Sequence, residues 1–150
     1  IAIPKIHMEP GRSLVADAGM TIYTVTNVKE VKGYKNYVSI DGGMTDNPRY
    51  TLYESRYTVV LASRANDEKD FVATISGRCC ESGDLIQEDV NITKPLKDEI
   101  LAVLTTGAYN YSMASNYNRV PRPPVVMLKD GEDYLAVKRE SLEDICSLDI

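Results

Sequence analysis

Residues 77–84 concentrate groups that can do chemistry. Two adjacent thiols, two carboxylates and two glycines stand in this stretch, directly after a strand-like run. Cys80 could transfer a proton or act as a nucleophile, and Glu81 could bind an ammonium group. Such groups gather more often in a loop held by a rigid scaffold than at the end of a core strand. The stretch is therefore a candidate catalytic or binding loop.

Three further segments carry complementary polar groups, and they are residues 9–12, 41–53 and 107–122. Arg12 and Arg49 can each bind a carboxylate or phosphate in a bidentate manner. Tyr53 and Tyr109 offer hydroxyl groups on stiff aromatic side chains. Two of the segments are unusually long for connections, and long ordered loops in a compact domain tend to be functional. Together these groups describe a site for a zwitterion such as an amino acid.

The elements that must position these groups are short strands separated by turns. β-branched and aromatic residues dominate residues 21–28, 37–40, 57–62, 71–76, 85–92 and 100–104. This spacing predicts a mostly β domain, built as a barrel or a sandwich. Asp130 and Gly131 predict a hairpin between residues 125–128 and 134–137. Residues 141–144 have the pattern of a capping box that opens a short C-terminal helix.

The first twenty residues have a different pattern. Residues 1–9 read as the last part of a strand that ends at the turn Pro10-Gly11. Residues 13–18 predict a short helix, with Ser13 as its N-cap and Gly19 at its end. Because the chain starts inside a strand and without an initiator methionine, we expect it to be a fragment of a longer protein.

Composition excludes several classes of function. A chain of 150 residues suits one domain with a real core. Its net charge of -5, with no basic cluster, argues against a nucleic-acid partner. Its apolar runs are far shorter than the roughly 20 residues that cross a bilayer. Three cysteines, two of them adjacent, make no disulfide framework, so a cytoplasmic location is expected. A single histidine, His7, supplies neither a zinc cluster nor a Cys–His pair, so no metal site is expected.

Four segments resemble the diaminopimelate decarboxylase family, in that family's order. They are Glu9-Pro10-Gly11-Arg12, the stretch 41–53 with Asn47-Pro48-Arg49, Cys80-Glu81-Ser82-Gly83-Asp84, and residues 107–118. The resemblance covers essentially the whole chain. It implies a pyridoxal 5'-phosphate enzyme of the alanine-racemase-like fold, which has a (β/α)8 barrel followed by a C-terminal β domain. Residues 1–20 would be the remnant of the last barrel strand and helix, and residues 21–150 the β domain.

The resemblance also implies a reaction, which is the decarboxylation of meso-2,6-diaminopimelate to L-lysine and CO2. Cys80 would protonate the carbanion that the cofactor stabilises after CO2 leaves. Arg12, Arg49 and Tyr53 would bind the carboxylate at the non-reacting end of the substrate, and Glu81 the ammonium group there. The cofactor phosphate would be bound by Glu9, Pro10, Gly11, Arg12 and Tyr109, and Tyr109 would also touch the substrate.

A homodimer with shared active sites is implied as well, because Cys80 and Glu81 of this family reach into the neighbouring subunit's site. The lysine that forms the Schiff base would lie upstream, so the chain alone is expected to be inactive. Adjacent residues of an extended chain point to opposite sides, so Cys79 is expected to pack inward while Cys80 faces the site. Tyr111 and Tyr117 are expected to support the site.

Two alternatives stay open. The chain could be the β domain of a related decarboxylase that acts on carboxynorspermidine, ornithine or arginine. Ornithine and arginine decarboxylases of this fold have a Cys-Asp pair where this chain has Cys80-Glu81. The other alternative is a non-catalytic β domain that binds a partner.

Overall fold

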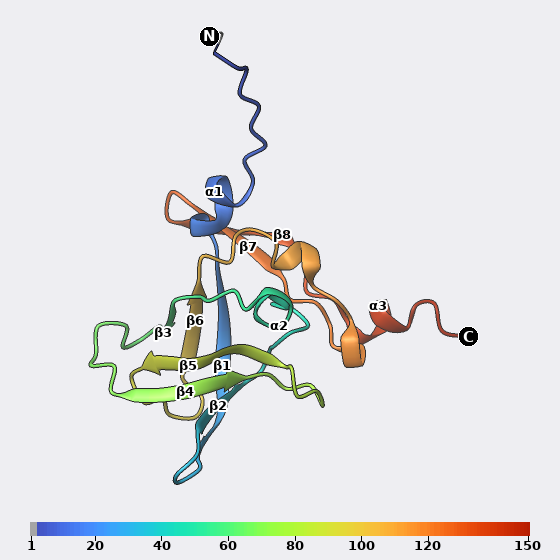
Figure 1. Cartoon of the computed structure of the whole chain (residues 1–150). Coiled ribbons are helices and arrows are strands. Elements are labelled where there is room, and N and C mark those ends of the chain that lie inside the picture. Colours follow the sequence, from blue (N-terminus) through green and yellow to red (C-terminus); the bar gives the residue numbers. More distant parts are fainter. Residues whose placement is uncertain (1–2) are drawn as a thin grey trace.

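The computed structural model describes residues 3–150 and is built around one six-stranded sheet (Figure 1). The strand order in the sheet is β3-β6-β1-β2-β4-β5. The strands are β1 (Met20–Glu30), β2 (Asn36–Ile40), β3 (Val59–Leu61), β4 (Phe71–Ser76), β5 (Leu85–Ile92) and β6 (Ile100–Leu104). Each matches a strand predicted from the sequence, so the mostly β class is confirmed.

The long strand β1 joins the two halves of the sheet. Its first half pairs antiparallel with β6 and its second half pairs antiparallel with β2. A bulge between Val25 and Asn27 separates the two halves, and bulges of this kind increase the local twist. The edge strands β3 and β5 lie next to each other, and the amide N of Tyr57 donates to Gln87 Oε1 at 2.6 Å. The sheet therefore curls into a nearly closed barrel.

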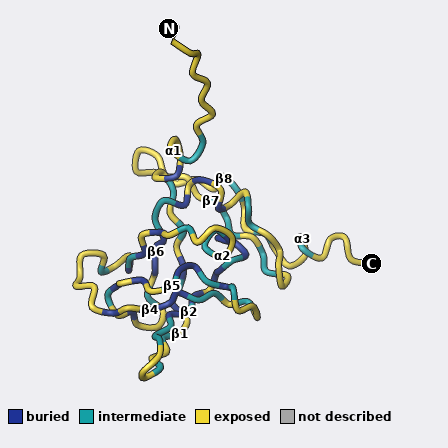
Figure 2. Tube along the Cα trace, in the orientation of Figure 1, coloured by how far each residue is buried: buried dark blue, intermediate teal, exposed yellow. Residues whose placement is uncertain are grey.

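Apolar side chains at alternate strand positions fill the barrel. Val25, Ile40, Ile75, Ile86 and Leu101 are fully buried within one core cluster. Burying a side chain of this size stabilises a fold by about 1.5–3 kcal/mol relative to leaving it exposed. Figure 2 shows the buried residues concentrated in the sheet, while the N-terminal segment and the outer loops are exposed. The loops that carry the candidate site residues are thus connected to a rigid barrel.

Short helices and one hairpin complete the chain. They are α1 (Arg12–Val15), η1 (Ala16–Ala18), α2 (Arg49–Tyr53), η2 (Tyr111–Met113), η3 (Tyr117–Arg119), the β7 (Val125–Lys129) and β8 (Glu132–Val137) hairpin, and α3 (Leu142–Cys146). The predicted turn at Asp130 and Gly131 is confirmed, since both residues have positive φ. The capping box of α3 is also confirmed, with reciprocal hydrogen bonds between Ser141 and Asp144.

Two predictions for the N-terminal segment were wrong. Residues 3–10 form no strand and extend away from the barrel (Figure 1), because no strand among the described residues lies beside them to pair with. The predicted strand also includes residues 1–2, which lie outside the described residues. The helix α1 begins at Arg12 with Gly11 as its N-cap and without a side-chain cap, so Ser13 does not cap it. Gly19 ends η1 as predicted.

Within residues 3–150, no helix has the length and apolar character needed to cross a membrane.

Candidate functional site

The ring of Tyr109 is the meeting point of the two predicted anion-binding arginines. The guanidinium carbon of Arg12 lies 5.9 Å from the ring centroid, and that of Arg49 lies 5.6 Å from it. Both distances are in the range of cation–π contacts. A second ring, that of Tyr53, lies 5.0 Å from Arg49. Residues that are far apart in the sequence are thus gathered into one cluster of two arginines and two tyrosines, here called the arginine cluster.

Backbone hydrogen bonds explain how α1 comes to lie against residues 107–122, here called the tyrosine-rich loop. The amide N of Gly107 donates to the carbonyl oxygen of Ala16 at 3.0 Å, and that of Thr106 donates to the carbonyl oxygen of Gly19 at 2.9 Å. Gly11 packs so closely on Tyr109 that an added Cβ would lie 2.2 Å from the tyrosine hydroxyl. Gly11 therefore brings the backbone of the predicted phosphate segment next to Tyr109.

The tyrosine-rich loop also holds the segment that leads into α2. The amide N of Ser115 donates to the carbonyl oxygen of Thr45 at 2.8 Å, and Arg49 Nη1 lies 3.8 Å from the sulfur of Met113. Tyr109 itself has a φ of +65°, which is uncommon for a residue with a side chain. Strained backbone of this kind is often found at functional sites.

The charges of the arginine cluster are not neutralised by carboxylates. Among residues 3–150, the ion pairs include neither Arg12 nor Arg49. The Nε atom of Arg49 is buried and makes no hydrogen bond within the described part of the chain. A buried donor without a partner costs free energy, about 1–3 kcal/mol, unless something binds it. The arginine cluster is therefore suited to an anion.

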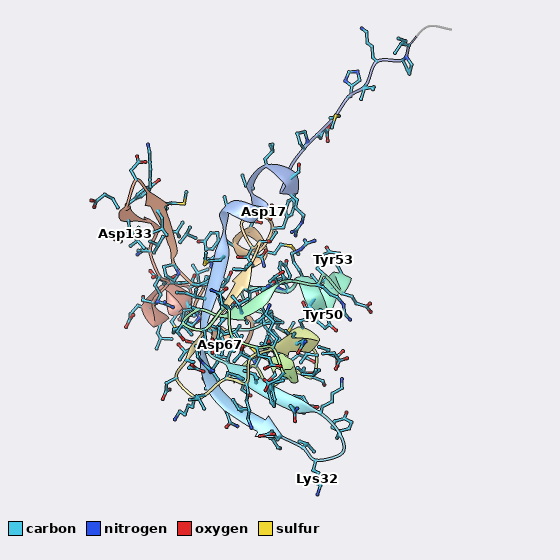
Figure 3. All side chains as sticks on the ribbon, turned by 90° about the vertical axis from the view of Figure 1, so that its left-hand side faces the viewer. Asp17, Lys32, Tyr50, Tyr53, Asp67 and Asp133 are labelled. Atoms are coloured by element: carbon cyan, nitrogen blue, oxygen red, sulfur yellow. The ribbon has the colours of Figure 1, made fainter. Side chains whose placement is uncertain are left out.

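The cluster is open to solvent. Tyr53 is 61% exposed and Tyr109 is 47% exposed. In Figure 3, Tyr53 extends from α2 at the edge of the molecule. A cavity of about 480 Å³ opens elsewhere, at the turn between β1 and β2, and no member of the arginine cluster lines it. Glu9 and Pro10, predicted to approach a cofactor phosphate, are exposed in the extended N-terminal segment.

The loop 77–84 presents Cys80 and Glu81 to solvent. Cys80 is exposed and Cys79 is partly buried, as expected, but the cause differs from the predicted one, because residues 78–80 form bends and not an extended chain. Burial, together with the nearby carboxylate of Asp84, raises the pKa of the Cys79 thiol. Cys79 therefore stays protonated at neutral pH, and Cys80 is the accessible thiol of the pair.

Glu81 is contacted by a tyrosine that was expected only to support the site. The hydroxyl of Tyr117 donates to Glu81 Oε2 at 3.4 Å, and the amide N of Gly83 donates to Glu81 Oε1 at 3.3 Å. The charge of Glu81 raises the pKa of Tyr117, so this hydroxyl stays a donor. The carboxylate is thus oriented and still exposed.

The arginine cluster and the Cys80 loop lie on different faces of α2. Arg49 and Tyr53 are four residues apart and share a face of the helix, as their contact shows. Thr51 stands two residues from Arg49, about 200° around the helix. Its hydroxyl donates to the carbonyl oxygen of Gly83 at 2.6 Å. The Cys80 loop is therefore attached to the face of α2 that points away from Arg49.

Two buried carboxylates within these loops, Asp84 and Asp46, anchor the backbone, a role that was not predicted from the sequence. Asp84 is 3% exposed and accepts hydrogen bonds from the amides of Met44 and Cys79, each at 2.6 Å. Asp46 accepts from the amide of Gly43 at 3.0 Å and from the hydroxyl of Tyr23. Both aspartates stand next to glycine-rich turns, which is a sequence signal for such anchoring.

Known proteins resemble this chain throughout. The family described as pyridoxal-dependent decarboxylase, C-terminal sheet domain, matches residues 14–107. Diaminopimelate decarboxylase of Bacillus subtilis is 52% identical over 99% of the chain, and that of Staphylococcus aureus is 48% identical over 97% of it. The chain covers 34% of each, so it spans about a third of the length of these relatives.

Solved structures agree with this similarity. A diaminopimelate decarboxylase from M. jannaschii in co-complex with L-lysine matches with a TM-score of 0.86 and 36% identity, over 95% of this chain and 32% of that one. The Helicobacter pylori enzyme complexed with L-lysine matches with a TM-score of 0.84 and 33% identity, over 93% of this chain and 34% of that one.

Proposed function

The chain belongs to the family of pyridoxal-dependent decarboxylases as their C-terminal sheet domain, and from this premise we propose that it is the C-terminal part of a diaminopimelate decarboxylase. The complete enzyme converts meso-diaminopimelate to L-lysine and CO2 in the cytoplasm. The observation that carries the proposal is the arginine cluster. Within residues 3–150, its two guanidinium groups form no ion pair with a carboxylate, and the buried Nε of Arg49 has no hydrogen-bond partner, so the cluster can bind an anion.

The described residues fit a cofactor that bears a phosphate. Gly11 brings backbone amides against Tyr109, and Arg12 adds a positive charge beside the same ring. Tyr109 can donate its hydroxyl to a phosphate oxygen, with residues 9–12 closing around the group. Pyridoxal 5'-phosphate supplies an electron sink for the carbanion that remains when CO2 leaves.

The substrate would be held at its non-reacting end by groups of opposite charge. Arg12, Arg49 and Tyr53 bind the carboxylate, because a guanidinium group and a carboxylate form paired hydrogen bonds. Glu81, oriented by Tyr117, binds the ammonium group. Cys80 is exposed beside Glu81 and donates the proton to the α-carbon, a step for which a thiol that reaches the reacting atom is suited.

A homodimer with shared sites is part of the proposal. Arg49 and the Cys80 loop lie on different faces of α2. This arrangement supports the proposal that they contribute to two different active sites. The arginine cluster is also open rather than enclosed. Each site would then combine the arginine cluster of one subunit with Cys80 and Glu81 of its partner.

Substrate preference of the full-length enzyme tests the proposal. We expect kcat/KM for meso-diaminopimelate to exceed that for ornithine, arginine or carboxynorspermidine by at least about 10³-fold, because substrates without the distal carboxylate leave the arginine cluster unpaired. Arg49→Lys should erase most of this preference, and Arg56→Lys, an exposed arginine outside the cluster, should not. Comparable rates on all substrates would reject the assignment.

The Schiff-base lysine is proposed to lie in the two thirds of the relatives' length that the chain does not cover. The chain alone is therefore expected to be inactive and to form no imine with the cofactor. Borohydride treatment followed by intact mass measurement checks this expectation, and a cofactor fixed to a lysine of this chain would contradict it.

A further inference from the structure

Asp84 connects the two loops that carry the proposed catalytic and binding groups. Its Oδ1 accepts from the amide of Met44 and its Oδ2 from the amide of Cys79, both at 2.6 Å. Its own backbone closes the loop, since the amide of Gly77 donates to its carbonyl oxygen at 2.8 Å. One carboxylate thus bridges the loop 77–84 and the loop 41–53.

The space around this carboxylate is shaped to admit it. An added Cβ at Gly43 would lie 2.2 Å from Oδ1 of Asp84, and an added Cβ at Gly77 would lie 2.2 Å from both oxygens. Neither glycine could carry a side chain while the carboxylate stays in place. Both loops therefore approach Asp84 as bare backbone, and its two oxygens use the amides that this approach exposes.

The hydrogen bond from the Cys79 amide to Asp84 also affects Cys80, the next residue. With the amide of Cys79 fixed to Oδ2, the next residue, Cys80, points to solvent while Cys79 stays partly buried. The loop 41–53 has support of its own, because Asp46 and Asn47 donate their amides to the carbonyl oxygen of Gly43. Loss of the carboxylate would therefore disturb the Cys80 loop more than Arg49.

We propose, on the basis of the proposed decarboxylase function, that Asp84 is the positioning residue that aims Cys80 at the reacting carbon. Asp84 is buried and acts through the amides of Met44 and Cys79. An asparagine at this position would keep one acceptor but turn an N–H toward the other amide, so one of the two bonds would be lost and replaced by repulsion.

The test uses the full-length enzyme with Asp84→Asn, and Asp89→Asn as the matched control at an exposed aspartate on β5, the strand that follows Asp84. In Asp84→Asn we expect faster amide hydrogen exchange in peptides over 77–84 and 41–49, with β1 and β6 unchanged. We expect kcat to fall about 10²-fold, as misplacement by an ångström can do. In D2O, deuterium should enter both faces of the reacting carbon rather than one.

Exchange rates and deuterium placement that stay as in the wild type would overturn the role of Asp84. If Asp84→Asn does not fold, Asp84→Ser, which lacks the repelling N–H, is measured in the same way. Failure of both to fold would show that Asp84 acts on the whole fold and would also reject a positioning role. If the wild-type enzyme does not decarboxylate diaminopimelate, the proposed function fails, while hydrogen exchange still reports on the Asp84 bridge.

Discussion

The two adjacent thiols of the loop 77–84 have different environments. Cys79 is partly buried, and its pKa is raised by burial and by the neighbouring Asp84. Cys80 is exposed beside Glu81. A proton donor must reach the reacting atom, so accessibility distinguishes the two residues even though their chemistry is the same.

Replacement of each cysteine separately tests this distinction. In the full-length enzyme, Cys80→Ala should lower kcat by about 10²–10⁴-fold, which is the usual contribution of a positioned acid. Cys79→Ala, the matched control, should leave kcat within about threefold of the wild type, because its thiol is turned toward the protein. Steady-state kinetics of both variants provide the measurement, and the reverse ranking would assign the donor role to Cys79.

At the scale of elements, the Tyr23 hydroxyl on β1 anchors the turn that precedes α2. It donates to Asp46, whose pKa is raised by burial and lowered by this hydrogen bond. Burial disfavours the charged carboxylate, so Asp46 destabilises the fold as the pH rises through its pKa. The hydrogen bond from Tyr23 offsets part of this effect.

Tyr23→Phe should therefore reduce the free energy of unfolding by about 1–3 kcal/mol at pH 7, because a buried carboxylate loses a donor. The loss should shrink at pH 4, where Asp46 becomes protonated in the variant. Urea unfolding at the two pH values measures both effects, with Tyr134→Phe, an exposed tyrosine on β8, as the control. An equal loss at both pH values would contradict this role of Asp46.

The β7–β8 hairpin is tied to the tyrosine-rich loop by Glu140. This carboxylate accepts from Arg122 and from Asn116, and the pKa of Glu140 is lowered to about 2, mainly by Arg122. A lowered pKa means that the stabilisation is complete above the unfolded pKa of about 4.3 and is lost as the pH falls toward 2.

Glu140→Gln should lower the melting temperature at pH 6, and the difference from the wild type should vanish progressively between about pH 4.3 and 2. Thermal unfolding across this range is the measurement. Glu132→Gln serves as the control, because Glu132 has no ion pair among residues 3–150. A difference that persists unchanged at pH 2 would show that charge on Glu140 is not the cause.

Sequence patterns predicted the strands well because each strand carries its own local enrichment in β-branched and aromatic residues, as β1 and β4 do. They failed for residues 3–10, where strand formation depends on a neighbour and not on local preference. The greater burial of Cys79 was predicted but its cause was not, because residues 78–80 form bends instead of the extended chain on which the prediction rested. The bridge made by Asp84 could not be predicted, because it joins residues 44 and 84, which only the folded barrel brings together.

At the scale of the whole molecule, several apolar side chains outside the barrel core are exposed. Leu14, Met20, Ile22, Val126 and Leu128 each have more than half of their surface open to solvent. They belong to α1, the first half of β1, and β7. We expect these side chains to be covered in the full-length protein, either by the part that this chain does not span or by a second subunit.

The division of α2 into two faces gives the proposed sharing of active sites between subunits a direct test. Arg49→Ala and Cys80→Ala are prepared as full-length variants and combined in the same sample by unfolding and refolding. If sites are shared, a mixed dimer contains one site with both Arg49 and Cys80 intact. Random pairing then restores about a quarter of the wild-type activity per dimer, since half of the dimers are mixed and each has one intact site. Activity that stays at the level of the separate variants would contradict the shared site.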